Sequence, residues 1–597
     1  MDEKPKSIWK KPLKGPRGIL LSFVVLFTAV FWVFFLLGFV SAKNNSMTQL
    51  AVFASICAGC SVLAGVLMLV FVRSIRWLCC RRNFRRFFFA LACFTTLISL
   101  FYAEEDWRGR HAWNQFKREW KAKGEKFDFK DFIPPPVPDD QNFAMTPIWV
   151  ESMKAMLGPE RSRPWFGDKY AENGRTNFTD PLDLNFRREN GWNDSPTNGD
   201  WARETITDLK PWQAYFRAPV QTNRNSRITT NEFPIAPQPQ SPAEDVLLAL
   251  SRYSLAIEEL RQASQLPYSR FPLYYDYEYP GAILLPQLAA VKKCTMVLQL
   301  RAIAELHNGQ SGKALADVKL SLRLTDSIHT EPFLISHLVR IAMLQITLQP
   351  IFEGLAEHRW SDPQLVALDA ELAKLDFLAN YKFVMRGELG LQSANTVYLI
   401  RNRQDLWMVS SEDGVPLIPP RIYPLIPTGW FYQNQLNCAC MVVEYYVPLA
   451  DVNQETISPA AARHADEALK AETKKTTPYN ILEKLLLPWL GNVAGKFAYA
   501  QASVNLARTA VALERYRLAH GQYPESLDAL APQFMEKIPH DIINGQPLKY
   551  CREADGQFVL YSVGWNETDD GGVVGETKGK EAGFEFGDWV WRYPEKK

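Results

Sequence analysis

The chain has 597 residues and a net charge of +2 at pH 7, and 47% of its residues are hydrophobic. This length allows about two to four domains, with ample material for a core. Residues 1–103 contain 13 basic and 2 acidic residues, a charge of +11, which leaves −9 on residues 104–597. A mildly acidic main portion argues against nucleic-acid binding, which requires a basic face.

Three apolar runs occupy residues 18–42, 47–72 and 87–103. The first two carry no charge, and each is long enough to cross a hydrocarbon core of about 30 Å. The apolar core of the first run is too long for a signal peptide. The third run is at the lower limit of length for a span. We predict three transmembrane helices, with an interfacial position of the third run as the open alternative.

Basic residues predict the orientation of these runs. Lys and Arg cluster before the first run and between the second and third, whereas the loop between the first and second holds only Lys43. Basic residues favour the cytoplasmic side of a membrane. We therefore expect a cytoplasmic tail at residues 1–17 and an extracytoplasmic portion after residue 103. If the third run lies in the interface, that portion returns to the cytoplasm.

Cysteine usage permits two interpretations of the outer portion. Cys57 and Cys60 stand in the second apolar run, where small packing residues are expected. The portion after residue 103 holds four cysteines, which could form disulfides in an oxidising compartment: Cys294, Cys438, Cys440 and Cys551. Free buried thiols are the default expectation.

Residues 104–240 are predicted as a helix followed by an irregular segment. Trp113, Phe116 and Trp120 recur at helical spacing, so the third helix continues outward with an aromatic stripe packed on the soluble portion. The stretch 104–240 holds 14 of the 39 prolines and 8 of the 18 tryptophans. Such a segment cannot be mostly helical, yet it is too aromatic for simple disorder. We expect an ordered wrap with four aromatic anchors: Trp165, Trp192, Trp201 and Trp212.

Residues 241–475 are predicted as an irregular α-hairpin stack. Capping boxes begin helices at Ser241 and Ser361. Further helices are expected at residues 282–307, 312–327, 332–357 and 378–399. The helices at residues 282–307 and 312–327 are similar to a tetratricopeptide hairpin, but no 34-residue period is sustained. The stack is interpreted as a surface for peptides or proteins, or equally as a plain helical core.

Residues 476–597 are predicted as a long helix and a small α+β domain. The helix spans residues 493–520 and ends at Gly521. Short segments rich in aromatic and β-branched residues predict strands at residues 548–551, 557–563 and 584–591. The fold class is thus a membrane-anchored, mainly α chain with a small C-terminal α+β domain.

The last hundred residues carry a motif set that resembles one known family. The matching residues are Gly521, Tyr523, Pro524, Asp541, Gly545, Pro547, Tyr550, Phe558, Tyr561, Ser562 and Gly564. This pattern resembles the globular part of type II secretion major pseudopilins. The resemblance implies a calcium site in the acidic loop at Asp569 and Asp570, where hard oxygen ligands suit the ion. A solvated turn is the default interpretation of that loop. The prepilin cleavage motif is absent at this position, so polymerisation is not implied.

Motifs for catalysis are weak throughout the chain. The run GNVAGK at residues 491–496 is one residue short of a phosphate loop. His329 and His337 are expected to be packed or capped. The adjacent carboxylates at residues 104–106 and 139–140 are interpreted as solvated turns. No catalytic or cofactor-binding residue is predicted, and enzymatic activity is left open with a leaning against it.

The whole chain resembles uncharacterised bacterial envelope proteins that join a membrane anchor, a helical region and this tail. The resemblance implies a bacterial inner-membrane location. We expect an extracytoplasmic interaction or scaffold protein whose partners are the membrane and other envelope proteins. Two alternatives stay open: an accessory of a secretion or pilus-like assembly, and an enzyme or binder acting on envelope polysaccharide.

Overall fold

The computed structural model describes most of the chain after residue 80. The described ranges are 81–166, 180–184, 186, 195–218, 220–221, 229–230, 233–275, 279–407, 411–412, 415–416, 419–487, 490–576 and 582–594, with isolated positions between 25 and 73. The first two predicted transmembrane helices lie largely outside the described residues. The chain divides into two compact units, Met1–Glu104 and Glu105–Lys597.

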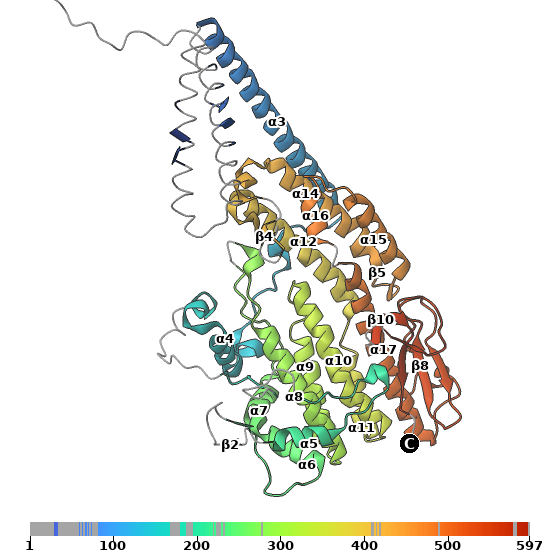
Figure 1. Ribbon diagram of the computed structural model, residues 1–597. Helices are drawn as coiled ribbons and strands as arrows, with labels where there is room; N and C mark the ends of the chain where they lie inside the picture. The colour runs from blue at the N-terminus through green and yellow to red at the C-terminus, as the bar shows by residue number, and fades with distance from the viewer. Residues whose placement is uncertain are drawn as a thin grey trace, which may run out of the picture. The chain divides into compact units, whose positions relative to one another are not determined.

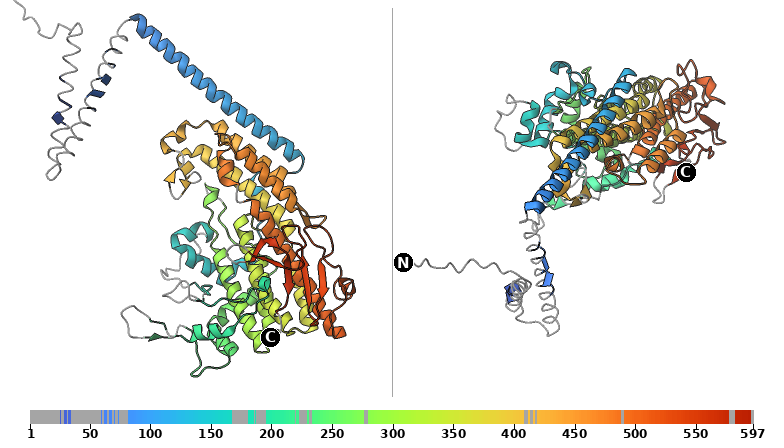
Figure 2. Two further views of the ribbon diagram at one scale, coloured as in Figure 1. Left: turned by 45° about the vertical axis from the view of Figure 1, so that its right-hand side comes forward. Right: turned by 90° about the horizontal axis from the view of Figure 1, so that it is seen from above.

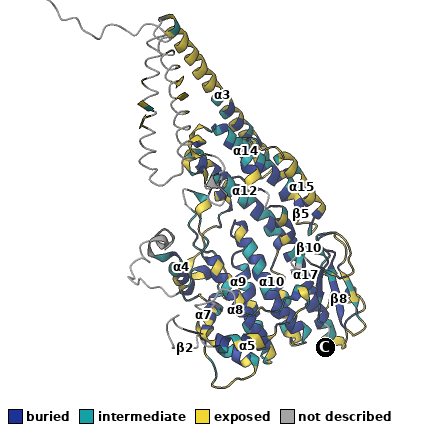
Figure 3. Cartoon of the chain, viewed as in Figure 1, coloured by how far each residue is buried: buried dark blue, intermediate teal, exposed yellow. Residues whose placement is uncertain are grey.

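Helix α3 (Arg81–Ala122) is unbroken for 42 residues (Figure 1). At 1.5 Å per residue it is about 63 Å long. This confirms that the helix of the third apolar run continues beyond residue 103. None of its most apolar 18-residue window is buried, and Figure 3 shows the N-terminal part of α3 largely exposed. Trp113 and Phe116, farther along the helix, are buried in the body, as predicted for the aromatic stripe.

Among the described residues, three helical segments are long and apolar enough to cross a membrane. One is Arg82–Ala122, and the other two are Pro280–His307 and Leu334–Ala356. The apolar windows of these two are 44% and 67% buried inside the protein. Both pack in the helical stack and bury charged groups there, including Glu305 and Arg340. We therefore assign them to the core of the body.

The helical stack follows the predicted order of elements. Its helices are α8 (Gln287–His307), α9 (Ser311–Asp326), α10 (Leu334–Ala356), α11 (Asp362–Leu372) and α12 (Phe377–Arg401), of which α8, α9 and α10 lie side by side in Figure 1. The predicted capping boxes at Ser241 and Ser361 are both present. Gly309 joins α8 to α9 with φ +71°, a conformation that glycine adopts without strain.

In its described part, the segment between α3 and α8 contains four α-helices, of which the first two belong to the predicted wrap and the last two to the predicted stack. These are α4 (Pro147–Phe166), α5 (Leu209–Arg217), α6 (Pro242–Leu250) and α7 (Ser254–Ala263). Of the predicted aromatic anchors, Trp201 and Trp212 are buried, which confirms them. The side chains of Trp165 and Trp192 are outside the described residues. Asn142 joins the wrap to the loop between α7 and α8, because its Oδ1 accepts a hydrogen bond from Arg270 N at 2.9 Å.

The C-terminal region begins with helices and ends in a small sheet. The helices are α14 (Thr428–Cys440), the π-helix η10 (Met441–Tyr446), α15 (Pro459–Thr473), α16 (Ile481–Leu486) and α17 (Gly491–His520). Gly521 ends α17 with φ +80°, as predicted. The antiparallel sheet has the order β11-β8-β7 and packs on α17 (Figure 2). Its strands are β7 (Lys549–Arg552), β8 (Phe558–Ser562) and β11 (Trp589–Arg592).

Short strand pairs complete the described elements. They are β1 (Val220–Gln221) with β2 (Thr229–Thr230), β3 (Ser411–Glu412) with β4 (Val415–Pro416), β5 (Ala450–Asp451) with β6 (Thr456–Ile457), and β9 (Val574–Glu576) with β10 (Ala582–Gly587). One hydrophobic cluster runs from Trp113 through the stack and α17 to Trp591. The C-terminal sheet and the stack therefore share a core. The domain boundaries predicted within residues 104–597 stay predictions.

Two further sequence predictions concern the carboxylates at residues 104–106 and the cysteines. The solvated turn expected at residues 104–106 is wrong, because α3 continues through it and Glu105 is only 5% exposed. All five described cysteines are free thiols: Cys93, Cys294, Cys438, Cys440 and Cys551. Cys294 and Cys438 are buried, as expected for the outer cysteines, whereas Cys440 is half-buried and Cys551 is exposed.

Candidate functional site

A polar cleft of about 500 Å³ opens between α9, α11 and the loop that follows α7. We call it the α9–α11 cleft. Four cations line it, Arg261, Lys319, Arg323 and Lys374, together with the carboxylates Asp326 and Glu371. On α9 the lining positions 316, 319, 320, 323 and 326 recur at intervals of three or four residues, which places them on one helix face.

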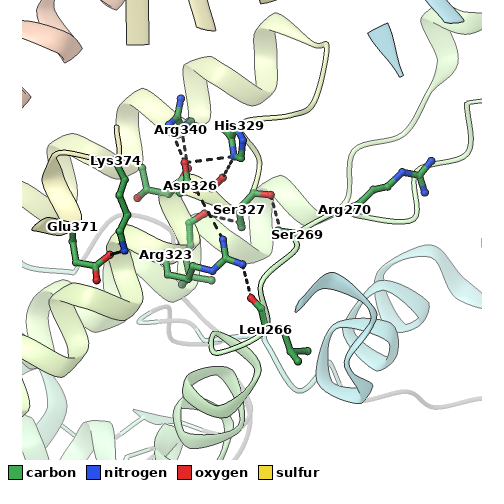
Figure 4. A network of polar contacts seen from close by, with 12 residues as sticks. Leu266, Ser269, Arg270, Arg323, Asp326, Ser327, His329, Arg340, Glu371 and Lys374 are labelled. Atoms are coloured by element: carbon green, nitrogen blue, oxygen red, sulfur yellow. Dashed lines mark hydrogen bonds and ion pairs between the residues drawn. The ribbon is translucent and has the colours of Figure 1, made fainter. Parts of the chain in front are cut away.

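Arg323 joins three segments at the wall of the cleft (Figure 4). Its Nη2 donates to the carbonyl of Leu266 in the loop after α7, at 2.9 Å. Its guanidinium lies 5.7 Å from the centre of the Phe143 ring, which belongs to the wrap. Burial lowers the pKa of Arg323 from its ordinary value, and Asp326 opposes this shift. The side chain therefore remains a cation and is positioned by the fold.

Asp326 is the anionic centre of the network in Figure 4. Its Oδ1 lies 3.2 Å from Arg340 Nη2 and 3.4 Å from His329 Nδ1. Arg340 is buried, and its guanidinium lies over the ring of Phe377 at 4.5 Å. Desolvation lowers the pKa of Arg340, and Asp326 raises it. The buried arginine thus fixes the carboxylate at the edge of the cleft.

Two lysines of the cleft share one carboxylate. Lys374 Nζ lies 2.6 Å from Glu371 Oε2, and Lys319 Nζ lies 3.6 Å from Glu371 Oε1. The lysine side chains are 63% and 45% exposed, whereas that of Glu371 is 21% exposed. Two cations around one anion leave a net positive charge on this rim. Such a rim attracts carboxylate or phosphate groups.

Buried carboxylates support the opposite wall. Arg261 Nη2 lies 2.6 Å from Asp317 Oδ1, and Arg301 Nε lies 3.0 Å from Asp317 Oδ2. Asp317 and its neighbour Glu305 are both buried, and desolvation raises the pKa of both carboxyls. Asp317 thus holds Arg261 in place, and Arg301 joins Asp317 to Glu305.

The charged groups that line the cleft can form ion pairs and hydrogen bonds with a ligand. A nucleophilic mechanism requires a hydroxyl or thiol hydrogen-bonded to a base. Within the described part of the chain, no hydroxyl or thiol hydrogen-bonds to His329, whose Nδ1 contacts the Asp326 carbonyl at 2.7 Å. The expected packed or capped histidine is confirmed for His337, which is buried on α10 with Nε2 3.0 Å from the Glu331 carbonyl.

Two glutamates near the start of α10, the buried Glu331 and the half-buried Glu388, were not singled out by the sequence. Glu331 is buried and accepts from Gln287 and Ser336, and burial raises its pKa to about 7. Glu388 accepts from the Leu334 backbone N–H at 2.7 Å and lines a cavity of about 140 Å³. Burial also raises its pKa to about 7. No local sequence signal marks either residue, because their burial comes from contacts between separate helices.

Asp569 and Asp570, the predicted calcium ligands, each contact different side chains of this chain. Asp569 Oδ2 lies 3.1 Å from Lys549 Nζ, and Asp569 Oδ1 accepts from the Tyr561 hydroxyl at 3.0 Å. These contacts lower the pKa of Asp569. Asp570 Oδ2 accepts from Asn566 Nδ2 at 2.8 Å. Across the described ranges, no group of three or more His, Cys, Asp or Glu is placed to hold a metal. Calcium at this pair stays a prediction.

The motif residues of the tail do contact one another. Asp541 Oδ1 accepts from Ser562 Oγ, and Asp541 Oδ2 accepts from Val563 N, both at 2.9 Å. Tyr550 donates to the Pro524 carbonyl at 2.7 Å, and Tyr523 packs edge-to-face on Phe558. These contacts join the turn after α17 to β7 and β8.

Comparison with known proteins found no match to a family model, to a curated protein or to a solved structure.

Proposed function

We propose that the chain is a membrane-anchored interaction protein that holds a helical body at the surface of a bilayer. One observation carries this proposal: α3 continues without a break from an exposed apolar segment to an aromatic stripe buried in the body. A helix with this division of surfaces suits lipid at one end and protein packing at the other.

The charge pattern supports an extracytoplasmic body in a bacterial inner membrane. Arg81, Arg82, Arg85 and Arg86 stand at the start of α3, and the portion after residue 103 carries −9. Basic residues favour the cytoplasmic end of a transmembrane helix. The N-terminus is then cytoplasmic, and the body is on the other side of the membrane.

The α9–α11 cleft is the partner site in this proposal. Its rim carries Lys319 and Lys374 around a single carboxylate, with Arg323 in the wall. Clusters of this kind recognise acidic segments of other proteins. The partner is therefore an envelope protein that presents acidic side chains.

A second candidate function is an accessory role in a secretion or pilus-like assembly. The motif residues that resemble those of pseudopilins form one connected structure, centred on Asp541 and its bonds to Ser562 and Val563. The polysaccharide alternative has less support, because Trp201 and Trp212 are buried and offer no open aromatic surface. We rank both alternatives below the role of an interaction protein.

Topology is tested with reporters fused after Lys597. A reporter active only in the periplasm is expected to work, and a reporter active only in the cytoplasm is expected to fail. The reverse result would overturn the placement of the body.

The partner is tested by cross-linking in intact membranes and identification by mass spectrometry. Lys374→Glu places a second carboxylate beside Glu371, and we expect it to abolish the cross-linked partner. Lys292→Glu makes the same charge change at an exposed position on α8 and serves as the matched control. Equal capture by both variants would remove the cleft from the proposal. Secretion components among the captured proteins would favour the second candidate.

A further inference from the structure

An apolar cavity of about 340 Å³ lies between α14, α16 and the 3-10 helix η9 (Pro420–Leu425). We call it the α14–α16 cavity. Its walls include Leu406, Ile422, Trp430, Phe431 and Leu482. Three of these wall residues, Leu406, Phe431 and Leu482, belong to a small hydrophobic cluster that also contains Leu399 and Tyr423. This volume falls in the range of ligand pockets.

The polar wall atoms of this cavity are already bonded within the protein. Asn434 Nδ2 donates to the carbonyls of Trp430 and Pro478, both at 2.7 Å, and Asn434 Oδ1 accepts from Leu482 N at 2.8 Å. Thr477 Oγ1 donates to Asn480 Oδ1 at 2.9 Å. The cavity therefore suits an occupant that is apolar, because a polar ligand would find its partners engaged.

Large apolar side chains are exposed around the cavity. Leu425 is 63% exposed, and Trp407, Ile422 and Leu485 are also exposed. Arg421 on η9 and Lys484 on α16 are exposed cations on the same elements. A patch of apolar side chains with neighbouring cations is typical of surfaces that meet lipid chains and anionic headgroups.

Hydrogen bonds join α14 and the segment before α16 to α3, just after the apolar segment of α3. Trp430 Nε1 donates to Glu105 Oε2 at 3.0 Å, and the Tyr479 hydroxyl donates to Glu105 Oε1 at 3.0 Å. Gly429 N donates to Asp106 Oδ1 at 2.7 Å. Glu105 stands two residues after the predicted apolar run, a rise of about 3 Å along a helix. Trp430, a residue of the cavity wall, is thus hydrogen-bonded to α3 just after the end of the predicted apolar run.

We propose that the surface formed by η9, α16 and the first turn of α14 docks on the bilayer that α3 crosses, and that the α14–α16 cavity takes an acyl chain of a bilayer phospholipid. The proposal rests on the membrane anchoring set out under Proposed function. Tryptophan at the interface and apolar side chains below it match the usual composition of a membrane boundary. The body then has two attachments to the membrane, α3 and this surface.

The test is photo-cross-linking of the full chain in vesicles of phosphatidylethanolamine and phosphatidylglycerol. The photo-reactive residue p-benzoylphenylalanine replaces Phe94, Leu425 or Leu255 in three separate proteins. Phe94 is 62% exposed on α3 and reports the anchor, whereas Leu255 is 83% exposed on α7 and is the control for exposure alone. We expect lipid adducts at positions 94 and 425 and none at position 255.

The outcomes separate this inference from the proposed function. Adducts at position 94 without adducts at position 425 would refute the docking surface and leave the anchor in place. Loss of adducts at both positions would refute the anchor and, with it, the docking surface. Protein adducts at position 425 in intact membranes, without lipid adducts, would assign the patch to a protein partner and overturn the proposal.

A second measurement addresses the cavity. Leu485→Asp introduces a carboxylate at an exposed position of the cavity lining, and Leu255→Asp makes the same change on α7. We expect the first variant to lose the phospholipid that is retained by purified wild-type protein, as counted by mass spectrometry. The second variant should retain it. Equal retention by folded Leu485→Asp protein would exclude the cavity as the acyl-chain site.

Discussion

Replacement of Glu331 by glutamine should remove part of the pH dependence of folding stability. The Glu331 carboxyl is buried, with Gln287 Nε2 at 2.9 and 3.1 Å from its two oxygens. Ser336 Oγ donates to the same carboxyl. Glutamine has nearly the same shape, and its amide can exchange hydrogen bonds with both partners. The substitution therefore removes the titration and preserves the packing.

The magnitude follows from the raised pKa of Glu331. Burial raises this pKa from 4.5 to about 7, so the folded protein keeps a proton that the unfolded chain loses above pH 4.5. The free energy of unfolding then falls by about 1.4 kcal/mol for each pH unit between these two values. The total loss approaches about 3 kcal/mol and is complete above pH 7. The glutamine variant lacks this loss.

The assay is urea unfolding of the full chain in detergent micelles at pH 5 and pH 8, followed by tryptophan fluorescence. The stability difference between the wild type and Glu331→Gln should change by about 2–3 kcal/mol between the two pH values, in favour of the variant at pH 8. Other buried carboxyls titrate in both proteins and cancel in this difference. Glu259→Gln, at an exposed position of α7, should leave the wild-type profile unchanged. Parallel profiles for the wild type and Glu331→Gln would refute the reasoning.

Three further substitutions test the packing of α3 and of the tail. Gly429→Ala should lower stability by about 1–3 kcal/mol, because its Cβ would lie 1.9 Å from the Glu105 carbonyl, whereas Gly312→Ala meets nothing within 4 Å and should be neutral or stabilising in thermal melts. Trp113→Ala should cost about 3–5 kcal/mol in urea unfolding, and Trp107→Ala, 66% exposed on the same helix, less than about 0.5 kcal/mol. Asp541→Ala leaves a buried hydroxyl and a buried backbone N–H unpaired, and should cost about 2–3 kcal/mol by the same measurement. Equal costs within either pair, or a neutral Asp541→Ala, would contradict the contacts described.

Short-range signals predicted most of the helices. The caps at Ser241 and Ser361 and the end of α17 at Gly521 depend on residues within one turn, so the sequence alone identifies them. The apolar run before residue 103 and its aromatic continuation are likewise readable by periodicity. The same reasoning predicted β7 and β8, because alternation and turn residues are local. The single strand expected at residues 584–591 is instead divided between β10 and β11.

The α9–α11 cleft could not be predicted in this way. Its cations come from α7, α9 and the end of α11, and nothing in the spacing of Arg261, Lys319 and Lys374 indicates that they meet. Local sequence also assigned Glu105 to a solvated turn, whereas Trp430 and Tyr479 bury it from distant parts of the chain.

The sequence by itself thus determined most of the helices, the apolar segment at the start of α3 and the charge difference between the two portions of this chain. Tertiary structure alone decided which polar groups are buried and which apolar helices form the core. The physical reason is that helix formation and capping depend on neighbours along the chain, whereas desolvation and ion pairing depend on neighbours in space. The α14–α16 cavity combines both, since the apolar side chains of η9 and α16 are local features of the sequence, whereas contacts such as that of Trp430 with Glu105 place the cavity wall beside α3.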